Sequence, residues 1–78
     1  MPRLPRASGD KHILAFKAAG WGINHIEGSH YILTKDESNI HLSIPVHKNK
    51  TLGIGLLKKL IAKAGLTNEE YMEYFYKK

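Results

Sequence analysis

Hydrophobic and polar residues change their spacing several times along this chain of 78 residues. Residues 1–8 contain two prolines and no periodicity, which predicts an extended lead-in with nothing to pack. A helix is predicted between about residues 10 and 19, with Ser8 or Asp10 capping its start and Gly20 following its end. Its apolar side chains share one face: Ile13, Leu14, Phe16 and Ala18.

Three later segments have the composition of β-strands. The first covers residues 21–26, and a tight turn at Glu27-Gly28 leads to the second, residues 29–34. A polar turn at residues 35–39 leads to the third, residues 40–46. Because such short connections join neighbouring strands, we expect one antiparallel sheet.

The third strand shows the clearest alternation, which predicts one buried and one wet face. Pro45 cannot donate to a β-ladder, so it belongs near a strand end or on an edge. In the second strand the pattern leaves two faces open: either Tyr31 and Leu33 meet the helices, or His30 and Ile32 do.

The best-defined helix runs from about Leu52 to Ala64, and Gly65 suits its C-terminal end. Thr67 and Glu70 then form a capping box that begins a short C-terminal helix. Seven apolar side chains of the longer helix fill one contiguous arc: Leu52, Ile54, Leu56, Leu57, Leu60, Ile61 and Ala64.

These elements predict an α+β fold in the order α-β-β-β-α-α, as one domain over residues 1–78 with residues 67–78 as the short last helix. The helices bury their apolar stripes on one face of a three-stranded antiparallel sheet and leave the other face free. The same order occurs in double-stranded-RNA-binding modules, which is an analogy of fold alone.

The net charge of +5 is concentrated in one part of the chain. Between Ser38 and Asn68 there is no acidic residue and there are five lysines: Lys48, Lys50, Lys58, Lys59 and Lys63. A stretch of one sign suits a polyanion such as RNA, DNA or an acidic protein. A solvated helix face kept soluble by lysine explains it equally well.

Other classes of protein fit the sequence poorly. There are no cysteines, which excludes disulfides and cysteine-ligated zinc. The first residues lack the apolar core of a signal peptide, and no segment has the roughly 18 apolar residues of a membrane span. We therefore expect a cytoplasmic protein that does not interact with membranes.

Several short motifs follow one another along the chain. Gly20-Trp21 follows an amphipathic helix, Gly28-Ser29-His30 opens a strand and Ile44-Pro45-Val46-His47 closes one. A helix then runs from Leu52-Gly53 to Ala64-Gly65-Leu66. Taken in order, these motifs resemble the HicA family of toxin–antitoxin systems. Each piece alone is weak, but their order and spacing cover nearly the whole chain, from about Pro2 to Phe75.

The resemblance implies a ribosome-independent endoribonuclease that cleaves mRNA, has a double-stranded-RNA-binding-like fold and is silenced by a HicB-type antitoxin. The family's catalytic histidine corresponds to His30. RNA supplies its own nucleophile, the 2′-hydroxyl, so an imidazole that moves protons near neutral pH suffices for catalysis. The competing interpretation is a solvated strand residue.

Phosphate binding is predicted for the residues around this histidine. Lys48 and Lys50 precede the free N–H groups of the helix that begins near Leu52, and both features favour an anion. The alternative there is a poorly helical, glycine-rich first turn. The complete set of predicted RNA-binding residues is Ser29, Lys48, Lys50, Lys58 and Lys59.

The remaining histidines lack the spacing of known metal sites, so we expect no metal and no other cofactor. His12 is predicted to be solvated, whereas His25, His41 and His47 can share a face with His30, and His47 is the best second proton-transfer partner. Glu27, beside the motif, would raise the pKa of His30 or hinder phosphate approach. Trp21 is expected in the core rather than stacked on a base.

Two other functions remain open. One is a non-catalytic RNA-binding module of the same fold, in which His30 only contacts RNA. The other is a protein-interaction subunit whose basic face docks an acidic antitoxin.

Overall fold

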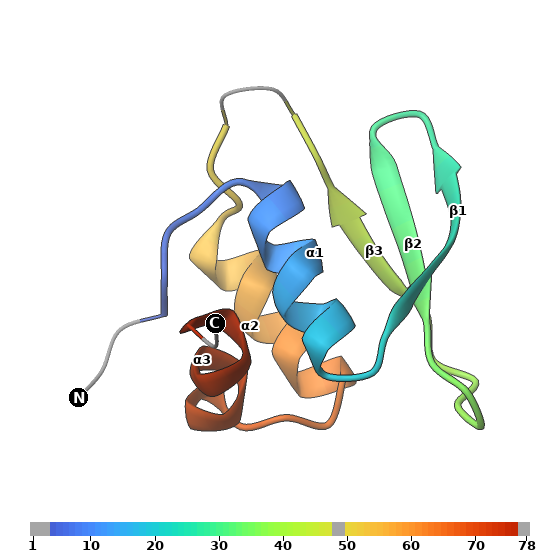
Figure 1. Ribbon diagram of the computed structural model, residues 1–78. Coiled ribbons are helices and arrows are strands. Elements are labelled where there is room, and N and C mark those ends of the chain that lie inside the picture. The colour runs from blue at the N-terminus through green and yellow to red at the C-terminus, as the bar shows by residue number, and fades with distance from the viewer. Residues whose placement is uncertain (1–3, 48–49, 77–78) are drawn as a thin grey trace.

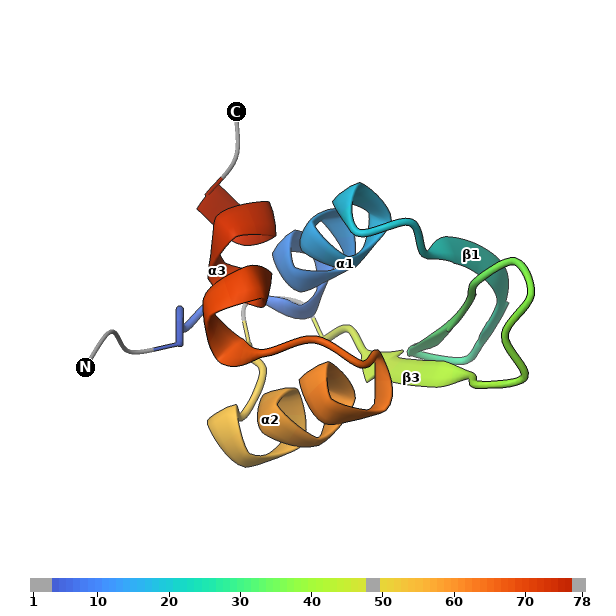
Figure 2. The ribbon, with the colours of Figure 1, turned by 90° about the horizontal axis from the view of Figure 1, so that it is seen from below.

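The computed structural model describes residues 4–47 and 50–76 (Figure 1). Its elements follow the predicted order: α1 (Gly9–Ala18), β1 (Gly22–Glu27), β2 (His30–Thr34), β3 (Leu42–Pro45), α2 (Ile54–Lys63) and α3 (Asn68–Tyr76). This is an α+β architecture with a three-stranded antiparallel sheet packed against helices, consistent with a double-stranded-RNA-binding-like fold. Figure 2 shows α1 and α2 beside the sheet and α3 on their far side.

The sheet has the order β1-β2-β3. Leu33 pairs with Leu42 and Tyr31 pairs with Ile44, so these side chains share the face that meets the helices. His30, opposite Pro45, is therefore on the other face, which is called the open face below. Pro45 is the last residue of an edge strand, as predicted, because the edge spares it a ladder hydrogen bond.

The third strand is shorter than predicted. It begins at Leu42 rather than at residue 40, and Ile40 is 41% exposed although its alternation predicted burial. Leu42 and Ile44 are completely buried, as expected, and Val46 packs against the core beyond the strand end.

Side chains from the sheet and all three helices form one hydrophobic core, to which α1 contributes differently from its prediction. Leu14 is 65% exposed, and Ala18 is exposed as well. The buried face of α1 contains Ile13 and Phe16, as predicted, and also Ala15 and the polar side chain of His12. The expectation of a solvated His12 is wrong, because α3 packs over this part of α1.

The end of α2 and the start of α3 form as their sequences predict, whereas Ser8 precedes α1 without a side-chain capping hydrogen bond and α2 begins at Ile54 rather than near Leu52. Gly65 has φ +76° after α2, and the N–H of Leu66 donates to the carbonyl of Ile61 at 3.1 Å, which completes a Schellman motif. In the capping box, Thr67 N donates to Glu70 Oε1 at 2.9 Å and Glu70 N donates to Thr67 Oγ1 at 3.1 Å. Within the predicted arc of α2, Leu56 departs from expectation and is 39% exposed.

The described part of the lead-in, residues 4–8, forms no helix, and the expectation that the lead-in packs on nothing is wrong. Leu4 joins the hydrophobic core, and the N–H of Leu52 donates to the carbonyl of Ala7 at 2.8 Å. Gly9 then begins α1 where a Cβ would collide with the carbonyl oxygen of Pro45. The segments before α1 and α2 are thereby held against the end of β3.

Candidate functional site

His30 is the first residue of β2, and its side chain is exposed on the open face of the sheet. Its cross-strand partners are Glu27 on β1 and Pro45 on β3, so it is flanked on both sides. The question that alternation left open is thus answered: Leu33 is buried and Tyr31 packs against the core, while His30 faces outward.

A β-bulge at Asn24 decides which other side chains share this face. Ile23 pairs with Leu33 and His25 pairs with Ile32, so the intervening Asn24 is an extra residue in β1. Beyond the bulge the alternation of β1 is reversed relative to a regular strand. His25 and Glu27 therefore lie on the open face with His30, and Ile26 turns to the helix side.

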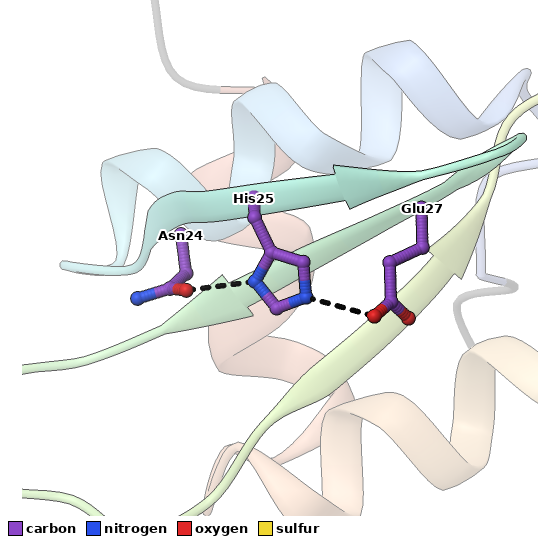
Figure 3. A network of polar contacts seen from close by, with 3 residues as sticks. All are labelled: Asn24, His25 and Glu27. Carbon is purple, nitrogen blue, oxygen red and sulfur yellow. Dashed lines mark hydrogen bonds and ion pairs between the residues drawn. The ribbon is translucent and has the colours of Figure 1, made fainter.

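The residues around the bulge form a polar network on β1. His25 Nδ1 lies 2.7 Å from Asn24 Oδ1, and His25 Nε2 lies 3.3 Å from Glu27 Oε1. Figure 3 shows the three side chains projecting across the near side of the sheet, with the helices behind it. The imidazole and the carboxylate are both exposed, with 47% and 71% of their side-chain surface accessible. Glu27, expected to act directly on His30, instead makes its ion-pair contact with His25.

The turn before His30 is joined to the segment that follows β3. Gly28 adopts φ +58°, a conformation that glycine accepts readily, and the carbonyl of Ser29 accepts a hydrogen bond of 2.7 Å from Val46 N. The N–H of Lys50 donates to the carbonyl of His47 at 3.1 Å, which keeps these two residues together. The exposed His47 and Lys50 thus lie near the end of the sheet that carries His30.

The other predicted phosphate-binding residues are distributed differently. Lys48 lies outside the described residues. Lys58 and Lys59 are exposed on α2, which packs on the helix side of the sheet, so the structure does not place them on the open face. At the start of α2, Arg6, Thr51 and Gly53 line a surface depression of about 310 Å³. No acidic residue occupies the first turn of that helix.

Comparison with known proteins supports the resemblance in the sequence. Residues 9–66 match the family model described as the HicA toxin of bacterial toxin–antitoxin systems. The chain belongs to the HicA toxin family. No curated protein matches the sequence. Membership in the HicA family implies an antitoxin as partner.

The HicA match ends at residue 66, so α3 lies beyond it. This helix nevertheless completes the core, because Tyr71 is fully buried and packs against Phe16 with ring centroids 4.9 Å apart. Phe75 packs against His12 at 5.3 Å. The C-terminal helix therefore covers the part of α1 that carries the buried histidine.

His12 was missed by sequence reasoning. Its Nδ1 contacts the hydroxyl of Tyr71, and its Nε2 is buried without a hydrogen-bond partner among the described residues. Burial lowers the pKa of His12 from 6.5 to about 4 and raises the pKa of Tyr71. The available signal was the position of His12 four residues before Phe16, on the same side of α1.

Side chains that could bind a metal ion do not gather in the described part of this HicA-family chain. Within residues 4–47 and 50–76, no three side chains of the histidine or carboxylate types come together to hold one. None of the helices in these described segments has the length and apolar character needed to cross a bilayer. Trp21 is 4% exposed in the core, as predicted, and so is not available for base stacking.

Proposed function

We propose that this HicA-family chain is an mRNA-cleaving toxin, that His30 is its catalytic histidine and that a HicB-type antitoxin inhibits it. The observation that carries the proposal is the exposure of His30 on the open face, beside the segment that contains Lys50. An RNA strand can approach this face because the helices pack on the opposite one.

The proposed reaction requires the protein to supply only proton transfer and phosphate binding. The 2′-hydroxyl of RNA attacks the adjacent phosphorus once its proton is removed, and an imidazole is suited to accept that proton near neutral pH. Lysine side chains such as Lys50 contribute phosphate binding that weakens as salt increases. The proposed reaction needs no metal ion, because nucleophile and proton acceptor are both supplied by organic groups.

Purified protein incubated with single-stranded RNA in EDTA tests this function. We expect cleavage by the unmodified chain and a decrease of about 10² to 10⁴ in rate for His30→Gln, the range typical of one general acid–base group. His41→Gln is the matched control, since His41 is an exposed histidine near the other end of the sheet. Its activity should be unchanged.

The result also separates the alternatives. RNA that is bound but not cut by the unmodified chain would support the non-catalytic RNA-binding module. Cleavage that survives His30→Gln would contradict the assigned role of His30. In cells, expression should arrest growth, and co-expression of the antitoxin should relieve the arrest. A chain that binds an antitoxin but neither binds nor cuts RNA would be the interaction subunit.

A further inference from the structure

The two histidines of the open face are diagonal neighbours across β1 and β2. His25 pairs with Ile32, and His30 lies two residues before Ile32 on the same side of the sheet. Diagonal neighbours of this kind are separated by about 7–8 Å between backbones, within reach of long side chains. Glu27 is directly opposite His30 and contacts His25, so it is a neighbour of both histidines.

Cleavage of RNA by its own 2′-hydroxyl requires two proton transfers at opposite sides of one phosphorus atom. The attacking oxygen must lose a proton, and the leaving 5′-oxygen must gain one. Each transfer needs a group within about 2.6–3.2 Å of its oxygen, so one imidazole serves both oxygens poorly at the same moment. Two imidazoles on either side of a phosphate serve both.

We propose that His25 is a second catalytic residue of this site and that Glu27 positions it, an inference that rests on the function proposed above. Nε2 of His25 carries a proton toward Glu27 Oε1, which fixes the orientation of the ring. Nδ1 is the atom that exchanges a proton with RNA. Its contact with Asn24 Oδ1 lies at the surface, where an RNA oxygen can replace it.

The reaction balances with these two residues. The bond between O2′ and phosphorus forms while the bond between phosphorus and O5′ breaks. The 2′-proton goes to His30, and the proton on Nδ1 of His25 goes to the leaving O5′. The products are a 2′,3′-cyclic phosphate and a 5′-hydroxyl, and proton exchange with water restores both imidazoles.

Few other groups compete for this role. The titratable side chains on the open face of β1 and β2 are His25, Glu27 and His30. The residues of β3, Leu42–Pro45, are not titratable. Beyond that strand lie the exposed His47, which the sequence favoured as second partner, and Lys50. The β-bulge favours His25 over His47, because it places His25 in the sheet beside His30.

The test is single-turnover RNA cleavage as a function of pH. The unmodified chain should give a bell-shaped profile, since one group must be unprotonated and the other protonated. His25→Gln should lose the alkaline limb and decrease the maximum rate by about 10² to 10⁴. His41→Gln should keep both the rate and the profile.

Glu27 has a distinct signature if it positions His25. Glu27→Gln should decrease kcat with little change in KM, because the orientation of His25 matters only during proton transfer. Glu27→Asp should recover part of the activity. Equal kcat in Glu27→Gln and the unmodified chain would remove the positioning role.

A second test uses the unmodified chain, so that its result does not depend on whether a variant folds. A 2′-deoxy oligonucleotide lacks the nucleophile and can bind without being cut. Its addition should shift the ring-proton NMR resonances of both His25 and His30. A shift confined to His30 would overturn the role of His25.

The outcomes distinguish the two proposals. Loss of activity in His30→Gln together with full activity and an intact profile in His25→Gln would overturn this inference and leave the proposed function standing. Loss of the alkaline limb in His47→Gln, but not in His25→Gln, would also overturn this inference and would identify His47 as the second proton-transfer residue. Absence of cleavage by the unmodified chain, or cleavage unaffected by His30→Gln, would remove both proposals.

Discussion

Histidine side chains are buried on the helix side of the sheet and exposed on its open face. His12 lies among Phe16, Tyr71 and Phe75, where burial lowers its pKa to about 4 and keeps it neutral at physiological pH. His25 and His30 lie on the open face with their rings exposed to solvent. The residue type therefore does not determine the environment of a histidine, and its position relative to the sheet decides whether the ring is buried in the core or accessible to solvent.

The largest expected difference between the two sides is in core packing. Leu33 and Ile32 are neighbours on β2, but Leu33 is completely buried and Ile32 is on the open face. Leu33→Ala should lower the free energy of unfolding by about 2–5 kcal/mol, and Ile32→Ala by clearly less. Urea denaturation of both variants measures this. Equal decreases would mean that the open face is covered in solution.

Acid should destabilise the chain through His12. Above pH 6.5 its ring is neutral in both folded and unfolded states, and between 6.5 and about 4 only the unfolded chain takes up the proton. Stability should therefore fall by up to about 3 kcal/mol as pH decreases through that window. His12→Gln should be less sensitive to acid over the same range, which denaturation at pH 7 and pH 4.5 can measure. An unchanged sensitivity would contradict the depressed pKa.

A smaller effect is expected from the hydroxyl of Tyr71. Tyr71→Phe leaves Nδ1 of His12 buried without its partner, at a cost of about 1–3 kcal/mol. Tyr76→Phe is the matched control on the same helix, since Tyr76 is 62% exposed and should change stability by less than about 0.5 kcal/mol. Similar melting temperatures for the two variants would show that the buried hydroxyl contributes little.

The smallest effect concerns Lys48 and Lys50, the lysines predicted to bind phosphate. Changing Lys48 and Lys50 together to Gln should leave the melting temperature unchanged and weaken RNA binding. For every RNA phosphate that a lysine no longer neutralises, the slope of log affinity against log salt should decrease by about 0.7 for single strands. Titrations at several salt concentrations measure the slope. An unchanged slope would place the phosphate-binding side chains elsewhere.

The sequence predicted those features that depend on neighbouring residues. The helix ends at Gly65 and Thr67 formed as expected, because caps and turns are specified by a few adjacent residues. The order of elements and the HicA resemblance were also confirmed, because both rest on a series of short local patterns along the chain. The position of Pro45 followed from its missing N–H.

The spacing of hydrophobic and polar residues could not predict contacts between residues that are distant in the sequence. The burial of His12 depends on α3, which lies about sixty residues later, and the same packing leaves Leu14 in solvent. The exposure of His30 could not be derived from alternation, which is symmetric between the two faces. The proximity of His25 and Glu27 to His30 depends on a bulge that no motif marks.

The β-bulge at Asn24 determines which side chains of β1 face solvent and which face the helices. Deleting Asn24 would leave His25 opposite Ile32 and the later pairs unchanged. If Asn24 instead paired with Ile32 in a regular ladder, His25 and Glu27 would turn toward the helices and Ile26 would turn toward solvent. The polar surface of β1 therefore depends on one residue that takes no place in the ladder.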